Sequence, residues 1–134
     1  MSIIIIIATA LAIVDTVWFC LTFKMYSEMV EKIQKSEYKP RFIASALSHF
    51  ILFIGMLYFV FPALRHHHGG GTTTHQAVMA HGFVYGLVTH GMLNATNCAM
   101  FTRYSVVVAF IDTIWGGVVC FLVAGFFVAV HNIK

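Results

Sequence analysis

The sequence predicts an all-α integral membrane protein, in which a single domain over residues 1–134 forms an antiparallel bundle of four transmembrane helices. Of its 134 residues, 60% are hydrophobic and 10% are charged, so the chain has more apolar surface than a soluble domain of this size could bury. Four apolar segments are each long enough for the roughly 20 residues that cross a hydrocarbon core. All eight lysines and arginines lie outside these segments, as the cost of placing a cation in lipid requires.

The four predicted spans are joined by connectors of different length. The spans cover residues 2–23, 42–64, 76–101 and 104–131. The first span is not preceded by a basic segment and contains an acidic residue, so we expect a permanent helix and not a cleaved signal. Only Thr102 and Arg103 separate the last two spans, which predicts a tight antiparallel hairpin.

The basic residues predict how the helices are oriented. Six of them lie in the first and third connectors, whereas Arg65 and Lys134 lie on the opposite side. The positive-inside rule therefore predicts that both termini and the second connector are non-cytosolic. The net charge of +3 follows from this topology, so we expect no nucleic-acid partner. The six residues are Lys24, Lys32, Lys35, Lys39, Arg41 and Arg103.

The first connector, from Lys24 to Arg41, is the largest surface outside the predicted spans. It carries Met25, Met29, Val30 and Ile33 at helical spacing among charged residues. Three interpretations are open, namely a continuation of the first helix, an amphipathic helix in the membrane interface, or an ordinary solvated connector. We expect this segment to contact any partner proteins.

The second connector is rich in histidine and is a weak candidate for metal binding. Its histidines are His66, His67, His68 and His75. Neutral imidazoles bind zinc or copper, but a glycine-rich loop offers no fixed geometry, and no cysteine or carboxylate lies nearby. We therefore predict a flexible loop without a metal site, and no cofactor.

Two of the five acidic residues, Asp15 and Asp112, lie in the middle of apolar spans, and each is followed three residues later by a tryptophan. A carboxylate inside a bilayer costs roughly 2.5 to 3.5 kcal/mol even on a lenient scale. Residues three apart share a helix face, so Trp18 and Trp115 should face the same interior as the acids. Because the first and fourth spans run in opposite directions, an approximate two-fold axis would relate the two Asp-x-x-Trp units, as in inverted repeats.

A rise of about 1.5 Å per residue places one polar residue of each span at a common depth. Asp15, His49, Asn94 and Asp112 all fall about 10 to 12 Å inside the boundary that the first and third connectors share. Asn97 falls slightly nearer that boundary. No lysine or arginine lies at this depth, so we expect at least one of the two acids to be neutral at pH 7.

This polar layer has two interpretations. It could be a hydrogen-bonded clasp that holds four helices in register, in which each bond contributes about 0.6 kcal/mol. Alternatively, Asp15 and Asp112 could relay protons or cations, with His49 and His90 as intermediates. We expect no enzyme, because the sequence lacks a nucleophile paired with a base, a phosphate-binding loop and a plausible metal triad.

Glycines in the last two spans predict close contacts between helices. Gly82 and Gly86 form a Gly-x-x-x-Gly motif in the third span, and Gly116 lies in the fourth. Small residues let transmembrane backbones approach one another, so we interpret these positions as packing sites. A bundle of this size has little room for a pathway of its own, so a channel would require a homo-oligomer.

The chain resembles a family of small membrane proteins of unknown function, domain of unknown function 2177, which occurs in bacteria and large DNA viruses. The family pattern has Gly-x-x-x-Gly, then Tyr-Asp-x-Thr-Asn, then Asp-x-x-Trp-Gly. The matching positions here are Gly82, Gly86, Leu93, Asn94, Thr96, Asn97, Asp112, Trp115 and Gly116. Asp15, Trp18 and Tyr26 resemble the family's first Asp-x-x-Trp and the tyrosine after it, and Tyr58, Phe61 and Pro62 resemble the end of its second helix.

One departure from the family pattern bears on function. Leu93 and Asn94 stand where the family has Tyr-Asp, so a mechanism that needs three acids cannot be carried over. A scaffold tolerates this loss better than a catalyst does. The resemblance thus implies a non-enzymatic structural or assembly component, in the internal membrane of a large DNA virus, that contacts capsid or assembly proteins through Lys24 to Arg41. The alternative is a proton-coupled transporter or small cation channel.

Overall fold

The computed structural model describes residues 3–62 and 72–132, which form four helices and contain no strand. Helix α1 spans Ile3–Gln34, α2 spans Phe42–Gly55 and continues through a π-helical turn, η1, at Met56–Val60, α4 spans Thr72–Met100, and α5 spans Val106–Asn132. The predicted all-α fold is therefore confirmed. The second connector, with His66, His67 and His68, lies outside the described residues.

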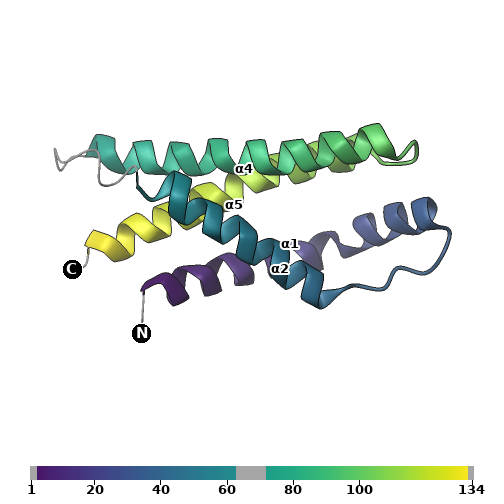
Figure 1. The fold of residues 1–134 in the computed structure, drawn as a ribbon, viewed down its shortest axis with the longest axis horizontal. Coiled ribbons are helices and arrows are strands. Elements are labelled where there is room, and N and C mark those ends of the chain that lie inside the picture. Colours follow the sequence, from purple (N-terminus) through teal and green to yellow (C-terminus); the bar gives the residue numbers. More distant parts are fainter. Residues whose placement is uncertain (1–2, 63–71, 133–134) are drawn as a thin grey trace.

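The helices run lengthwise in alternating directions, so the molecule has two distinct ends (Figure 1). At the terminal end, α1 begins and α5 ends. At the connector end, residues 35–41 join α1 to α2 and residues 101–105 join α4 to α5. The first and third connectors thus share one side of the molecule, as the sequence predicts.

Three of the helical segments are long and apolar enough to cross a membrane, namely Ile5–Gln34, Phe42–Val60 and Val106–Val130. Helix α4 is not among them, because histidines and asparagines along its length make it less apolar. It nevertheless packs antiparallel to α5 over most of its length (Figure 1). The crossing of the bilayer by residues 76–101 stays a prediction.

Helix α1 continues well past the apolar segment that ends at Phe23. Its 32 residues extend about 48 Å at about 1.5 Å per residue, longer than the hydrocarbon core of roughly 30 Å. The residues after Phe23 are mostly lysine, glutamate, methionine and glutamine, which favour helix. Of the three interpretations of the first connector, a continuation of the first helix holds as far as Gln34.

The end of α1 is tied down by local hydrogen bonds. Lys35 has a positive φ of 55°, which turns the chain out of the helix. The Gln34 side chain donates to the carbonyls of Ser36 and Glu37 at 3.1 and 3.0 Å, and the Tyr38 amide donates to Glu31 at 3.0 Å. These bonds fix the start of the chain that leads to α2.

Helices α4 and α5 approach so closely that their glycines have no room for a side chain. A Cβ on Gly82 would collide with the carbonyl oxygen of Cys120, and a Cβ on Gly86 would collide with that of Gly116. These contacts bring the two backbones together along the hairpin. The predicted packing glycines therefore lie at the α4–α5 contact.

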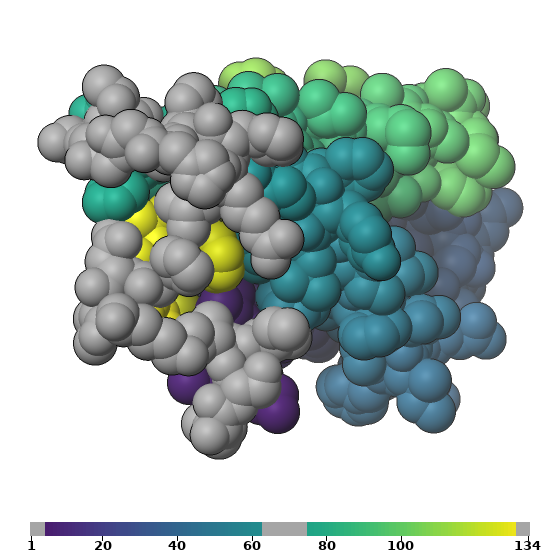
Figure 2. All heavy atoms as spheres, turned by 60° about the vertical axis from the view of Figure 1, so that its left-hand side comes forward, coloured from purple at the N-terminus to yellow at the C-terminus, as the bar shows by residue number. Residues whose placement is uncertain are grey.

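The apolar core lies toward the terminal end of the bundle. It is formed by residues that are almost completely buried in α1, η1, α4 and α5, including Ile7, Leu11, Met56, Val60, Val78, Val119 and Val123. Phe61 and Phe127 stack there with ring centroids 4.0 Å apart. Figure 2, turned so that this end comes forward, shows the α2–η1 segment in teal directly below green α4. The core fills the space among α1, η1, α4 and α5 on this side.

Candidate functional site

A polar cavity of about 410 Å³ lies between all four helices, on the connector side of the apolar core. It collects the predicted intramembrane residues Asp15 and Trp18 from α1, His49 from α2, and Asp112 and Trp115 from α5. From α4 it is lined by His90, Leu93 and Asn94, and from the α1–α2 connector and the start of α2 by Tyr38, Pro40, Arg41 and Phe42. Asn97 is half-buried and does not line it.

Asp15 is bound by two neighbouring helices. His49 Nε2 lies 2.9 Å from Asp15 Oδ2, and Trp115 Nε1 donates to Asp15 Oδ1 at 2.8 Å. The Asp15 side chain is 14% exposed and the His49 side chain 30%, so the carboxylate is the more deeply buried of the two. This first cluster joins α1, α2 and α5.

The hydrogen bonds of His49 constrain where its protons are. Nδ1 lies 2.7 Å from the Ser45 carbonyl oxygen, which can only accept, so Nδ1 carries a proton. Nε2 then either accepts a proton from a neutral Asp15 or donates one to an ionised Asp15. In both cases the Asp15–His49 contact holds one proton and the pair has no net charge.

Asp112 belongs to a second cluster, which is held by neutral donors. Tyr26 donates to Oδ1 at 2.5 Å, and the Asn94 amide donates to Oδ2 at 2.7 Å. The Asn94 amide oxygen in turn accepts from Tyr104 at 2.8 Å. Asn94 is only 2% exposed, so its hydrogen bonds offset the cost of burying an amide. No cationic side chain pairs with Asp112 in the described part of the chain.

The two tryptophans connect the two clusters. Their rings stack in parallel, with centroids 4.3 Å apart and planes 7° apart. Trp115 donates to Asp15. Trp18 Nε1 is buried and makes no direct hydrogen bond among the described residues, although the Tyr26 hydroxyl is near it. The predicted two-fold relation is thus approximate at best, because only one indole N–H reaches an acid.

The acids share a cavity, but they do not pair with one another. The sequence predicts an imidazole and an amide near the acids. In the structure, His49 lies beside Asp15 and Asn94 lies beside Asp112. Gly116 leaves room for the ring of His90, since a Cβ there would collide with the imidazole. His90 Nδ1 lies 3.1 Å from the Gly86 carbonyl oxygen.

Two tyrosines of the site, Tyr26 and Tyr104, are not among the site residues that the sequence predicts. Tyr26 lies past the predicted end of the first span, and Tyr104 precedes α5, which begins at Val106. The Tyr104 hydroxyl donates to the Asn94 amide oxygen. For Tyr26, the only signal in the sequence was its place in the family resemblance.

Among the residues that the structure describes, no group of three or more histidine, cysteine, aspartate or glutamate side chains is placed to hold a metal ion. His75 lies in the first turns of α4, on the terminal side, and the other histidines of the second connector fall outside the described residues.

The fold and the cavity together define a multi-pass α-helical membrane protein with a polar site enclosed by its helices. A family model described as "Predicted membrane protein (DUF2177)" matches residues 1–129, and the chain belongs to this family. No curated protein and no solved structure matches the chain.

Proposed function

We propose that the chain is a non-enzymatic carrier that exchanges protons for a small organic cation in the polar cavity. The observation that carries this proposal is that Asp112 and the Asp15–His49 pair line one cavity of about 410 Å³. A volume in this range is comparable to known small-molecule pockets. The sequence alone favours a structural role over transport. The cavity is the reason for which we now propose transport first.

The chemistry of the lining favours a cation over an anion. Asp112 has hydrogen-bond donors but no cationic partner among the described residues, so its carboxylate can attract a cation. Trp18, Trp115, Tyr26 and Tyr104 add aromatic rings, which attract cations through their electron-rich faces.

The access to the cavity supports a carrier rather than an open channel. The cavity extends to Tyr38 and Arg41 of the α1–α2 connector, and the apolar core lies toward the terminal end. A carrier open to one side has this arrangement, whereas a channel needs a continuous polar path. Transport then requires a second conformation that opens toward the terminal end.

A liposome flux assay tests this proposal. The purified protein is reconstituted, and a pH gradient drives uptake of ethidium or tetraphenylphosphonium. We expect uptake by the wild-type protein, and at least a tenfold loss in Asp112→Asn and in Asp15→Asn. Glu37→Gln is the matched control, because it also removes one carboxylate but lies on the exposed connector outside the cavity. Uptake at the level of empty liposomes for every probe contradicts the proposal.

A structural or assembly role, in the internal membrane of a large DNA virus, is the second candidate. It is favoured by the hydrogen bonds of Asp15, Asn94 and Asp112, which link α1, α2, α4 and α5 as a clasp would. The exposed connector after α1 would then contact capsid or assembly proteins. Co-sedimentation of the chain with assembled particles tests this role, and recovery only in particle-free membranes contradicts it.

A further inference from the structure

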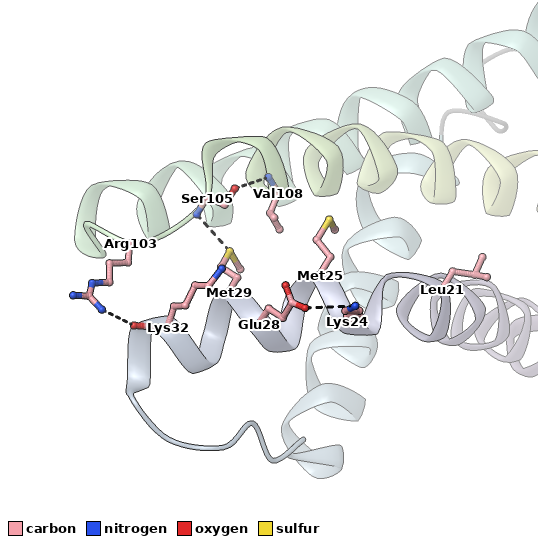
Figure 3. A pocket seen from close by; sticks show the side chains of 9 residues that line it. All are labelled: Leu21, Lys24, Met25, Glu28, Met29, Lys32, Arg103, Ser105 and Val108. Atoms are coloured by element: carbon pink, nitrogen blue, oxygen red, sulfur yellow. Dashed lines mark hydrogen bonds and ion pairs between the residues drawn. The ribbon is translucent and has the colours of Figure 1, made fainter.

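A second cavity, separate from the polar one, lies at the connector end between α1 and the turn that leads into α5 (Figure 3). Its volume is about 580 Å³. We call it the basic groove, and it is lined by Leu21, Lys24, Met25, Glu28, Met29, Lys32, Arg103, Ser105 and Val108. None of these residues lines the polar cavity.

The two halves of the basic groove differ in chemistry. Toward the membrane interior its walls are Leu21, Met25 and Val108, and toward the connector end they carry Lys32 and Arg103 (Figure 3). Leu21 is 78% exposed, so the apolar half opens sideways to the lipid. The groove is therefore amphipathic along its length.

The charge of the polar half is positive. Lys24, Lys32 and Arg103 face a single acid, Glu28. The Lys24–Glu28 ion pair is long, at 3.9 Å, and the Lys24 side chain is 91% exposed, so water screens it. Arg103 donates to the Lys32 carbonyl at 3.4 Å, and no carboxylate in the described part of the chain pairs with Lys32 or Arg103.

The groove lies where the membrane boundary is expected. The apolar segment of α1 gives way to charged residues at Lys24, and the candidate span of α5 begins at Val106. From Leu21 to Lys32 the groove follows α1 for about 16 Å at about 1.5 Å per residue. Leu21 and Val108 at the depth of acyl chains, with Lys32 and Arg103 at the depth of headgroups, match the polarity of a phospholipid.

We propose that the basic groove binds one anionic phospholipid. Its phosphate lies between Lys32 and Arg103, where the planar guanidinium can donate two hydrogen bonds to phosphate oxygens. One acyl chain lies against Leu21, Met25 and Val108. Basic pockets between transmembrane helices commonly hold anionic headgroups in this way.

Native mass spectrometry of the full chain, released from mixed vesicles, tests the proposal. The vesicles contain phosphatidylglycerol and phosphatidylcholine with identical acyl chains, so only the headgroup charge differs. We expect the wild-type protein to retain one phosphatidylglycerol at least tenfold more often than phosphatidylcholine. The double variant Lys32→Gln/Arg103→Gln should lose this preference.

The matched control is the double variant Lys35→Gln/Lys39→Gln, which removes the same charge at the same end but outside the groove. It should keep the preference for phosphatidylglycerol. An equal loss in the control indicates general surface attraction and overturns the proposal. So does equal retention of the two lipids by the wild-type protein, a measurement that needs no variant. Displacement of the lipid by millimolar inorganic phosphate would show a phosphate site without acyl-chain recognition and would also overturn it.

Discussion

At the scale of single residues, the two tryptophans have the same sequence context but different bonding. Trp115 donates to Asp15, whereas Trp18 Nε1 makes no direct hydrogen bond among the described residues. Both rings share one stack. The Asp-x-x-Trp motif therefore yields one donor that holds an acid and one buried donor that a solute or water could use.

Replacing each tryptophan by phenylalanine separates the hydrogen bond from the ring. We expect Trp115→Phe to lower the free energy of unfolding by about 1–3 kcal/mol, because Asp15 loses a buried donor. Trp18→Phe should cost less, since it keeps an aromatic ring and breaks no direct bond. Denaturation in detergent measures both variants. Equal losses of unfolding free energy in the two variants would contradict the assigned difference in hydrogen bonding between Trp115 and Trp18.

The proton held between Asp15 and His49 is a second prediction at this scale. We expect one proton between Asp15 Oδ2 and His49 Nε2 at pH 7. His49 Nδ1 carries another proton, which it donates to the Ser45 carbonyl oxygen. Infrared spectroscopy of labelled carboxyls, with nitrogen NMR of the imidazole, detects this proton on one partner or the other. An ionised Asp15 beside a neutral His49 would contradict the prediction.

The sequence predicted the depth of the polar residues but not their partners. Counting along apolar spans was enough to place Asp15, His49, Asn94 and Asp112 around one cavity, because helix rise is regular. The contact of Tyr26 with Asp112 depends on how far α1 continues and how it leans on α5. Such tertiary geometry leaves no periodic signal in a single sequence.

At the scale of elements, the hairpin of α4 and α5 is the most closely packed part of the molecule. Its small residues were visible in the sequence because Gly-x-x-x-Gly spacing places them on one face. The length of α1 was not fixed by the apolar pattern, since lysine and glutamate continue a helix beyond the lipid without any change of hydropathy period. The helix ends were therefore harder to predict than the helices.

Alanine at Gly86 should disrupt the hairpin. Its Cβ would overlap the Gly116 carbonyl, and we expect a loss of about 1–3 kcal/mol from overpacking. Gly91→Ala is the matched control, because a Cβ there meets only a Thr113 methyl at 3.3 Å, and alanine favours helix by about 0.5–1 kcal/mol over glycine. Thermal unfolding in detergent compares them. A Gly86→Ala protein as stable as Gly91→Ala would contradict the observed contact.

At the scale of the whole molecule, the polar cavity and the apolar core lie at different positions along the bundle. The core that includes Ile7, Met56 and Val119 closes the terminal end, and the polar cavity opens beside the connector. Counting from the first and third connectors placed the polar layer nearer the connector end, whereas the apolar core depends on tertiary packing that a single sequence does not show. Segregation of this kind makes solvent access one-sided.

Cysteine labelling tests this one-sided access. In a background without the native cysteines, Ser45→Cys, at the cavity wall, should react with a membrane-impermeant maleimide added on the connector side. Val119→Cys, in the core, should remain unlabelled. Labelling of the Ser45 position only from the cytosolic face would agree with the predicted non-cytosolic termini. Labelling of both positions to the same extent would contradict a closed terminal end.

The unbroken length of α1 links the interior of the protein to its host membrane. Asp15 and Lys32 lie on one continuous helix, 17 positions and so about 26 Å apart. When such a helix tilts about one point, its other residues move with it. We therefore expect a change in bilayer thickness that tilts α1 to alter the separation of Asp15 from His49 and Trp115 as well, so that the surrounding lipid affects the polar interior.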